Sequence, residues 1–384
     1  MTTFRLGVDG HVLDGKYQGS RTWLLENLRR APRLAPEITF VVYSADPSRA
    51  ADLIGLPEVE HHPIGGRGPV GRNLLFWSRA IRRDRLDLLL TQYFSPPRCA
   101  KRNVVVVHDV LFETHPQFFP WRTRWRNRIL VGWSARRARM LVTVSQYSRT
   151  QISKAYGRDP ADIALAHNGV DVAALQRSVA LPVEVPPGNP FALFVGRLEP
   201  RKNLRLALEA FGRIADPGVR LVVVGRDDFE DREVLSRLAH EPRAIQLVDV
   251  PADQLVELYR RAAVLVFPSL GEGWGLPVLE ALAAGTPVIA SDVTAIPEAG
   301  GLACTYFSPH ADDAAEQLAR ALGAALAGHI PFDADLARSH ARSFSWDRSA
   351  NELVIALRDA AKRARYTRAD QPINGHSSGD QTGH

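Results

Sequence analysis

The sequence predicts an α/β protein built from two doubly wound, Rossmann-like domains that face one another across a cleft. Short, continuously apolar runs recur along the chain, and a helix-like segment follows each of them, which is typical of parallel strands covered on both faces. The length of 384 residues suits two full-sized domains. A Pro-rich stretch, LPVEVPPGNP at 181–190, separates the two series of runs.

The apolar runs predict the strands in order. In the first half of the chain they lie at 4–8, 38–43, 86–90, 103–107, 140–144 and 163–166. In the second half they lie at 191–195, 219–224, 244–248, 263–267 and 287–291. Because ligands of open parallel sheets sit beyond the carboxyl ends of the strands, we expect the functional residues at those ends.

Domain boundaries follow from the same pattern. We expect an N-terminal domain over 1–185 and a C-terminal domain over 186–345. An amphipathic helix over 346–366 should follow and pack back toward the N-terminal domain. The remaining segment, 367–384, is polar and rich in Gly and Ser, so we expect it to be disordered.

The composition excludes several classes of protein. With 45% hydrophobic residues the chain can form cores, so wholesale disorder is excluded. Two cysteines, Cys99 and Cys304, are too few for a disulfide framework or a Cys-rich zinc site. We find no signal-peptide pattern at the N-terminus and no apolar run near the ~18 residues of a spanning helix. A reducing, cytoplasmic setting is therefore expected.

The net charge of +6 is unequally distributed. Residues 1–185 hold 27 Lys and Arg against 16 Asp and Glu, a balance of +11. Residues 186–384 hold 21 against 26, a balance of −5. A strongly basic half indicates an acidic partner: a nucleic acid, an anionic membrane or an acidic ligand.

The most informative segment is VLVFPSLGEGWGLPVLEALAAGTPVIAS at 264–291. A buried strand runs into a loop with three glycines and then into a helix that Pro277 can open and Gly285 can end. The glycines let the backbone approach a ligand closely, and the N–H groups of the new helix favour phosphate. The three are Gly271, Gly273 and Gly275.

Two glutamates accompany this loop. Glu272 lies within it and can reach a reacting centre, whereas Glu280 lies one turn into the helix and can accept hydrogen bonds from a ribose diol. The structural alternative is a solvated loop carboxylate and a second one favoured by the helix dipole.

A second strand, turn and helix occupy FALFVGRLEPRKNLRLALEAF at 191–211. Gly196 frees the turn, and Arg197 and Lys202 can converge at the end of the strand. Such a pair suits a diphosphate leaving group, because arginine offers a fork of donors and lysine a compact charge. The alternative is a pair of solvated surface cations.

These motifs, G-R-x4-K followed by E-x7-E within PSxxEGWGLPxLEAxAxGxPVIAS, resemble the family-4 glycosyltransferases. Members of that family are retaining enzymes of the GT-B fold. The resemblance covers most of residues 4–360, and its C-terminal motif is specific. It implies that the C-terminal domain binds a nucleotide-sugar donor and that the N-terminal domain binds the acceptor.

The resemblance also implies roles for individual residues. Arg197 and Lys202 would hold the diphosphate, Glu280 the ribose hydroxyls, and Glu272 a hydroxyl of the donor sugar. Gly196 would free the turn beside them. Backbone amides would contact the sugar and phosphate at Gly273, Trp274, Gly275 and Leu276.

Other stretches fit the same family pattern in part. His108 ends a predicted strand and matches the active-site histidine that reaches the donor sugar; the alternative is a histidine satisfied at the core edge. Asp109 and Ser145 are interpreted as structural, the latter as a helix N-cap. The turn before the first helix departs from the family pattern: Gly19 could bring an amide near the donor phosphate and Ser20 could cap the helix, but the acceptor loop is left undefined.

We expect no metal and no other cofactor. The only Asp-x-Asp spelling, Asp333 and Asp335, lies far from any strand end that resembles a donor site.

The segment 121–140 contributes much of the positive charge, with seven arginines and no acidic residue. Trp121, Trp125, Ile129 and Trp133 recur at every fourth position of this expected helix, with arginines around them.

Two explanations of this helix remain open. It can be an interfacial membrane or acceptor surface, formed by Trp121, Arg122, Arg124, Trp125, Arg126 and Arg128. Alternatively, its apolar stripe packs into the N-terminal domain, and its arginines are then either solvated or in contact with lipid head groups. The segment 65–85, with Phe76 and Trp77, could form a neighbouring part of such a surface. No recognisable motif supports nucleic-acid binding.

The sequence thus predicts a retaining glycosyltransferase that moves a hexose to a glycan or lipid-linked glycan in cell-surface polysaccharide synthesis. Mannose from GDP-mannose is the first expectation, from overall resemblance to bacterial polysaccharide mannosyltransferases, and a UDP-sugar donor is the alternative. A nucleotide-sugar epimerase and a non-catalytic membrane-associated binding protein of the same fold are weaker alternatives. The expected location is the cytoplasm, with possible peripheral binding to the inner face of the membrane.

Overall fold

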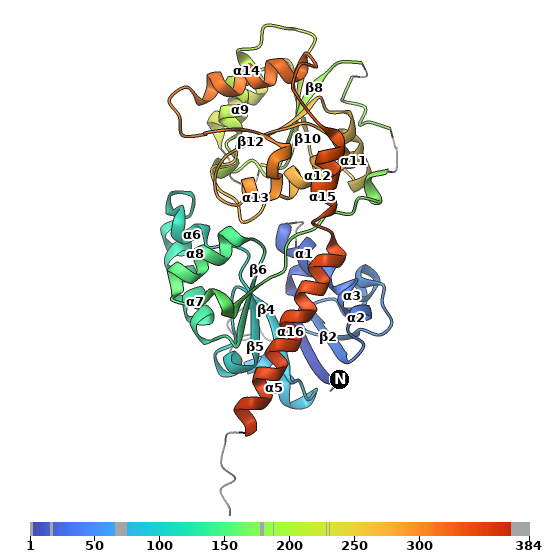
Figure 1. Cartoon of the computed structure of the whole chain (residues 1–384), viewed down its shortest axis with the longest axis vertical. Coiled ribbons are helices and arrows are strands. Elements are labelled where there is room, and N and C mark those ends of the chain that lie inside the picture. Colours follow the sequence, from blue (N-terminus) through green and yellow to red (C-terminus); the bar gives the residue numbers. More distant parts are fainter. Residues whose placement is uncertain are drawn as a thin grey trace, which may run out of the picture.

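The computed structural model describes residues 3–15, 18–65, 75–176, 180–186, 188–227, 229 and 231–369. Two α/β lobes lie one above the other, and one long helix, α16 (Trp346–Ala369), runs down along the lower, N-terminal lobe (Figure 1). Each lobe contains one parallel sheet, as predicted.

The N-terminal sheet has the strand order β3-β2-β1-β4-β5-β6-β7, and all its pairs are parallel. Its strands are β1 (Phe4–Asp9), β2 (Ile38–Ser44), β3 (Glu60–Pro63), β4 (Leu88–Gln92), β5 (Asn103–Val106), β6 (Met140–Thr143) and β7 (Ile163–Leu165). The helices of this lobe are α1 (Gly19–Leu28), α2 (Ala31–Leu34), α3 (Pro47–Ile54), α5 (Trp77–Arg83), α6 (Leu111–Thr114), α7 (Trp121–Arg137) and α8 (Gln146–Tyr156). The strand order reverses between β1 and β4, which creates a crevice at their carboxyl ends.

The C-terminal sheet has the order β10-β9-β8-β11-β12-β13, again all parallel. Its strands are β8 (Phe191–Val195), β9 (Arg220–Val224), β10 (Ala244–Leu247), β11 (Val264–Phe267), β12 (Val288–Ser291) and β13 (Thr305–Phe307). The helices are α9 (Leu204–Gly212), α10 (Arg232–His240), α11 (Ala252–Arg261), α12 (Leu276–Ala284), α13 (Ile296–Gly300), α14 (Ala314–Leu326) and α15 (Ala334–Arg342). Here the order reverses between β8 and β11.

All the strands expected from apolar runs are present, but two edge strands escaped prediction. β3 has the sequence EHHP and β13 the sequence TYF. Both lie at the edge of a sheet, where one side has no neighbouring strand and little apolar surface is buried. A strand of this kind lacks the apolar run by which the others were identified.

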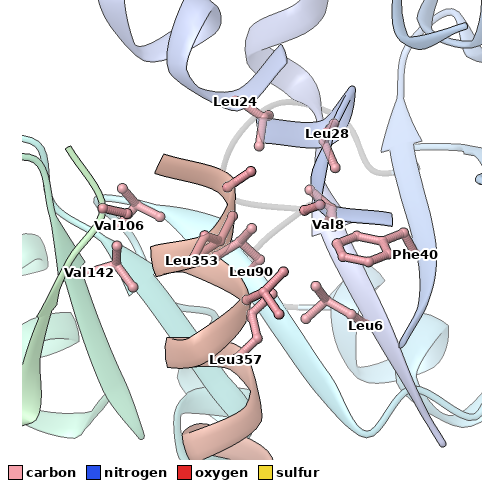
Figure 2. Close-up of a cluster of buried hydrophobic side chains, with 14 of the residues drawn as sticks. Leu6, Val8, Leu24, Leu28, Phe40, Leu90, Val106, Val142, Leu353 and Leu357 are labelled. Carbon is pink, nitrogen blue, oxygen red and sulfur yellow. The ribbon is translucent and has the colours of Figure 1, made fainter. Parts of the chain in front are cut away.

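The last helix, α16, completes the core of the N-terminal lobe. Leu353 and Leu357 point from α16 toward Leu6, Val8 and Leu90 on the sheet (Figure 2). An ion pair between Arg358 and Glu37, with 2.8 Å between Nε and Oε1, holds the same helix to the lobe. The chain thus crosses back from the C-terminal lobe to finish the first domain.

The extent of α16 corrects one expectation. The helix continues to Ala369, three residues into the segment expected to be a disordered tail. The reason is that no helix-breaking residue occurs before Pro372. The rest of that segment, 370–384, lies outside the described residues. In the described parts of the chain, no helix is long and apolar enough to cross a membrane.

Candidate active site

Two loops at the reversal point of the C-terminal sheet build the candidate site. One follows β8 and the other follows β11, and these strands are direct neighbours. The first loop turns at Gly196, whose φ of 154° lies in a region that side chains disfavour. The stem of Lys202 packs over Gly196, so a Cβ there would lie 3.4 Å from Lys202 Cε.

A buried cluster of charges joins these two loops. Glu272 Oε1 lies 2.7 Å from Lys202 Nζ, and Glu272 Oε2 lies 2.8 Å from Arg201 Nη1. Arg201 also pairs with Glu199 and donates to the carbonyl of Gly271. The side chains of Lys202, Arg201 and Glu272 are only 13%, 14% and 11% exposed, so their charges are poorly screened by water.

The cations keep Glu272 ionised. Burial alone would raise the pKa of Glu272, but Arg201 and Lys202 lower it to about 2. The loop is fixed further by a hydrogen bond from the Glu272 backbone N–H to Thr294 Oγ1 at 2.9 Å. A permanently ionised carboxylate can accept hydrogen bonds from hydroxyl groups and cannot serve as a general acid near neutral pH.

Arg201 is the main site residue that sequence analysis missed. Burial opposes its charge, but Glu272 and Glu199 raise its pKa above the ordinary value. It lies directly before Lys202 in the motif EPRKN, and that proximity was the available signal. Arg197, in contrast, is 47% exposed, contacts Glu199 at 3.3 Å and stacks over Phe229.

The glycine loop carries the chain from β11 into α12. A side chain at Gly273 would strike Asp109 Cβ at 2.9 Å, so this glycine lets the two lobes approach closely. Gly275, with φ of 143°, is the N-cap of α12. Pro277 is the second helical residue rather than the first, and Gly285, with φ of 82°, ends the helix as predicted.

Trp274 faces away from the loop surface. It is 3% exposed and packs against His167 and Phe344, with ring centroids 5.5 and 5.0 Å away. His167 follows β7 and Phe344 precedes α16, so the loop residue Trp274 contacts the two segments that connect the lobes. Its side chain is thereby committed to the core, and only its backbone is left to contact a donor.

Glu280 lies on α12, where Tyr259 Oη donates to its Oε2 at 2.8 Å. Burial raises the pKa of Glu280 to about 7, although the hydrogen bond from Tyr259 acts in the opposite direction. The carboxyl group therefore changes its protonation state near neutral pH. Tyr259, on α11, was not singled out by the sequence.

We predict that this carboxyl group makes stability depend on pH. In the folded protein Glu280 has a pKa of about 7, so it keeps its proton up to about that pH, whereas in the unfolded chain it loses the proton near pH 4.5. The contribution of Glu280 to stability therefore falls as the pH rises between these two values. Replacement Glu280→Gln should therefore stabilise the protein by roughly 2–3 kcal/mol more at pH 8 than at pH 4.5. Calorimetry at pH 4.5 and pH 8 measures the change in the free energy of unfolding, and Glu316→Gln, at an exposed position, is the control. A change caused by Glu280→Gln that is equal at both pH values would contradict the prediction.

The N-terminal lobe contributes His108 at the end of β5. Its Nε2 donates to Gln92 Oε1 at 2.8 Å, and burial lowers the pKa of His108 to about 4. His108 is therefore neutral near pH 7 and is held by Gln92, a residue that sequence analysis did not identify. Asp109 accepts from the backbone of Leu111 at 3.0 Å and so stabilises the turn, as expected.

Gly19 opens α1 and faces the other lobe. A Cβ on Gly19 would lie 3.9 Å from Leu276 Cδ1, so the start of α1 lies opposite the glycine loop. Ser20 lies inside the helix, whose N-cap is Gln18, and the expectation that Ser20 caps it is wrong. Ser145 does cap α8, accepting from Ser148 N at 2.9 Å.

Comparisons with known proteins identify the family. Residues 182–329 match the family model "Glycosyl transferases group 1", and residues 17–174 match "Glycosyltransferase Family 4". The chain is 31% identical over 278 residues to O-antigen chain mannosyltransferase B of Escherichia coli, covering 69% of this chain and 72% of that protein. The chain belongs to the family-4 glycosyltransferases.

A second relative is similar over part of the chain, and two solved structures share the fold. The transferase is 32% identical over 240 residues to D-inositol 3-phosphate glycosyltransferase of Mycolicibacterium paratuberculosis, which covers 58% of this chain and 53% of that protein. Sucrose-phosphate synthase of Thermosynechococcus elongatus superposes with a TM-score of 0.71 at 18% identity, covering 93% and 98% of the two chains. Anabaena HepE in complex with UDP and glucose superposes with a TM-score of 0.70 at 18% sequence identity. The superposition covers 93% of this chain and 100% of the HepE chain.

The two lobes of this glycosyltransferase are joined by ionic contacts at the edge of the site. Glu298, on α13, accepts from the backbone N–H groups of Gln146 at 2.8 Å and Tyr147 at 3.2 Å, at the start of α8. His167 lies between Glu298 and Glu352, with Nε2 3.6 Å from the first and Nδ1 3.0 Å from the second. Burial alone would lower the pKa of His167, but the two carboxylates raise it to about 9.

The basic helix of the transferase is α7, and only part of it packs as a core helix. Its buried residues are Val131, Gly132, Ser134 and Ala135, all in its second half. The alternative that the whole apolar stripe packs into the domain is wrong, since Trp121 is 64% exposed, Trp125 50% and Ile129 63%. Trp133 is half-buried.

Of the segment 65–85, which was expected to form a neighbouring surface, the structure describes residues 65 and 75–85. Residues 66–74 lie outside the described part of the chain. Trp77, on α5, is completely buried against Tyr43, so it cannot contribute to a surface.

Asp333, of the Asp-x-Asp pair, accepts hydrogen bonds from two backbone N–H groups at the start of α15 and caps that helix. Among the described residues, no group of three or more His, Cys, Asp or Glu side chains is placed to hold a metal ion.

Proposed function

We propose that the enzyme transfers a hexose, mannose from GDP-mannose in the first instance, to a glycan or lipid-linked glycan with retention of anomeric configuration. The observation that carries the proposal of sugar transfer is the Lys202–Glu272–Arg201 cluster at the reversal point of the C-terminal sheet. The identity with an O-antigen chain mannosyltransferase supports mannose as the sugar.

In the reaction proposed, the bond between the anomeric carbon and the diphosphate oxygen breaks. The acceptor hydroxyl oxygen bonds to that carbon from the same face, and its proton passes to a diphosphate oxygen. Lys202 has three N–H donors, of which one serves Glu272, so two are left for the departing phosphate. Arg197 would supply a second, more exposed cation, and no metal is required in this scheme.

Glu272 would orient the donor sugar. Its carboxylate is held by two cations and is ionised throughout the physiological pH range, which suits an acceptor of sugar hydroxyl hydrogen bonds. Glu280, one turn into α12, would accept from the ribose hydroxyls, and a carboxyl group with a pKa of about 7 accepts best above that pH. Nucleotide affinity should then increase as pH rises through 7.

A panel of donors tests the proposal. GDP at about 100 times its dissociation constant should stabilise the protein by about 2.7 kcal/mol. GDP-mannose should release GDP when a lipid-linked glycan acceptor is added, with and without a chelator. UDP and UDP-glucose, the alternative donor class, serve as the comparison, because HepE has been solved with UDP and glucose. Turnover with UDP-glucose but not with GDP-mannose would overturn the choice of mannose as the transferred sugar. Loss of activity when a chelator is added would overturn the metal-free reaction. No turnover with any donor would overturn the transferase proposal.

The acceptor is tested in the same assay. A relative named D-inositol 3-phosphate glycosyltransferase suggests inositol phosphate as a second acceptor to include. We propose that the acceptor is instead a glycan carried on lipid and that the enzyme works as a peripheral protein at the inner face of the membrane. Faster product formation with inositol phosphate than with the lipid-linked glycan would contradict this choice.

A further inference from the structure

The first half of α7, Trp121–Leu130, is an amphipathic helix whose apolar side is not covered by any of the residues that the structure describes. None of its ten residues is buried. Four of its side chains are large, apolar and well exposed: Trp121 (64%), Trp125 (50%), Ile129 (63%) and Leu130 (46%). Large aromatic side chains rarely remain in water without a partner, so this surface indicates a binding interface.

The apolar residues and the arginines of this segment are arranged in rows. Trp121, Trp125 and Ile129 are four residues apart and form one row along the helix. Arg122 and Arg126 form a second row on one side of it, and Arg124 and Arg128 form a third on the other. The apolar row is therefore bordered by positive charge on both sides, with no acidic residue anywhere in α7.

The arginines extend along the tryptophans. The guanidinium carbon of Arg122 lies 5.4 Å from the centre of the Trp121 ring, and that of Arg128 lies 5.8 Å from the Trp125 ring. Among the described residues, Glu113 is the carboxylate that pairs with this part of the helix, 3.6 Å from Arg128. Cations beside indole rings suit a boundary at which anionic phosphates lie just above apolar chains.

We propose that the segment Trp121–Leu130 docks the enzyme on an anionic lipid bilayer. The tryptophans and Ile129 enter the boundary between head groups and acyl chains, and the two rows of arginine contact lipid phosphates. A second copy of the chain fits this surface poorly. A two-fold symmetric contact would bring the arginine rows of one copy against those of the other.

The position of the segment agrees with an acceptor delivered from the membrane. Phe118, three residues before Trp121, lines a cavity of about 290 Å³ together with Leu198, Glu199 and Pro200 of the C-terminal lobe. Lys202 lies two residues after Pro200 in the chain. Three residues span at most about 11 Å, so the docking segment begins close to the loop that carries the proposed leaving-group cation.

This inference deepens the proposed function, since it names the surface on which the acceptor would be presented. Its test uses the full chain without donor or acceptor, so a failure is distinguishable from a failure of sugar transfer. The measurement is flotation with vesicles of phosphatidylcholine alone and of phosphatidylcholine mixed with phosphatidylglycerol. We expect binding to the anionic vesicles only, and we expect it to weaken as salt rises from about 0.1 M to about 1 M.

Two double variants separate the apolar and the charged contributions. W121A/W125A should lower the partition coefficient at least tenfold at either salt concentration. R122Q/R126Q should lower it roughly 25-fold at low salt, since each arginine near the surface contributes about fivefold, and much less at high salt. The controls are L302A, which removes a 93% exposed leucine, and R213Q/R320Q, which removes two exposed arginines of the other lobe.

Circular dichroism and the melting temperature verify that the variants fold; because the altered side chains are exposed, both should match the wild type. Equal binding by the variants and their controls, or equal binding to neutral and anionic vesicles, would overturn the proposal. So would a wild-type dimer that W121A/W125A dissociates while vesicle binding is unchanged, because the surface would then serve a second copy. Binding to a nucleic acid duplex that exceeds vesicle binding and is lost in both variants would overturn it in favour of a nucleic acid.

Discussion

The variant Lys202→Ala should lose turnover by about 10²–10³-fold and lose much less donor affinity. Lys202 lies in the loop that follows β8, 2.7 Å from Glu272, and its charge contributes most when the diphosphate departs. Removing one preorganised donor to a developing anion costs on the order of 10²–10³ in rate. Glu272 keeps its pair with Arg201 in the variant, so the loop should keep its position.

Kinetics and binding measured separately check this result. Turnover is followed by nucleotide release, and donor affinity by calorimetric titration, which separates kcat from binding. Lys154→Ala, which removes an exposed lysine of α8, is the matched control and should behave as wild type. Equal turnover by Lys202→Ala and wild type would remove Lys202 from the mechanism, and a parallel loss of affinity and rate would assign it to ground-state binding instead.

The variant Arg201→Gln should destabilise the C-terminal lobe by about 3–5 kcal/mol. Arg201 is 14% exposed and pairs with both Glu272 and Glu199, so its removal leaves two buried carboxylates short of a partner. The unfolding temperature of the lobe should fall by roughly 6–20 °C. The pKa of Glu272 should also rise, because one of the two cations that lower it is gone.

Matched substitutions make this second result specific. Arg213→Gln removes an exposed arginine directly after α9 that is paired with Glu209 at 3.1 Å, and it should cost no more than about 0.5 kcal/mol. Arg201→Lys keeps the charge but lacks the fork of donors, so its effect should be intermediate. A melting temperature for Arg201→Gln equal to that of Arg213→Gln would show that the buried ion pairs do not support the loop.

Much of the fold could be predicted from the sequence because the two sheets are buried on both faces. Runs such as FALFV at 191–195 are uninterrupted apolar segments, and each became a strand. The edge strands β3 and β13 could not be found this way, since their stability depends on pairing with one neighbouring strand rather than on apolar burial. The continuation of α16 to Ala369 was also missed, because the composition of the tail does not show how far a helix already formed extends into it.

The candidate site divides in a similar way. Glu272 and Lys202 could be named from a local motif, because glycines and helix starts have strong sequence patterns. Arg201 adjoins that motif but was missed, because its role depends on its distance to Glu272 on another loop. The partners Gln92 and Tyr259 could not be named, because their roles depend on contacts between different strands and helices. Burial and charge together set the pKa of a carboxyl group, and neither is visible in a linear sequence.

The sequence by itself determined the family and the two-domain α/β class, and it placed cations and glutamates in the loops that follow strands, since each rests on local patterns of apolar, glycine and charged residues. Only the tertiary structure decided that Glu272 is bound by two cations, that Glu280 titrates near neutral pH, and that Trp274 packs on the segments joining the lobes. It also excluded the explanation in which the whole tryptophan stripe packs into the domain. Periodicity shows that residues share one side of a helix, whereas only packing shows whether protein covers that side, and Trp121 and Trp125 are left exposed.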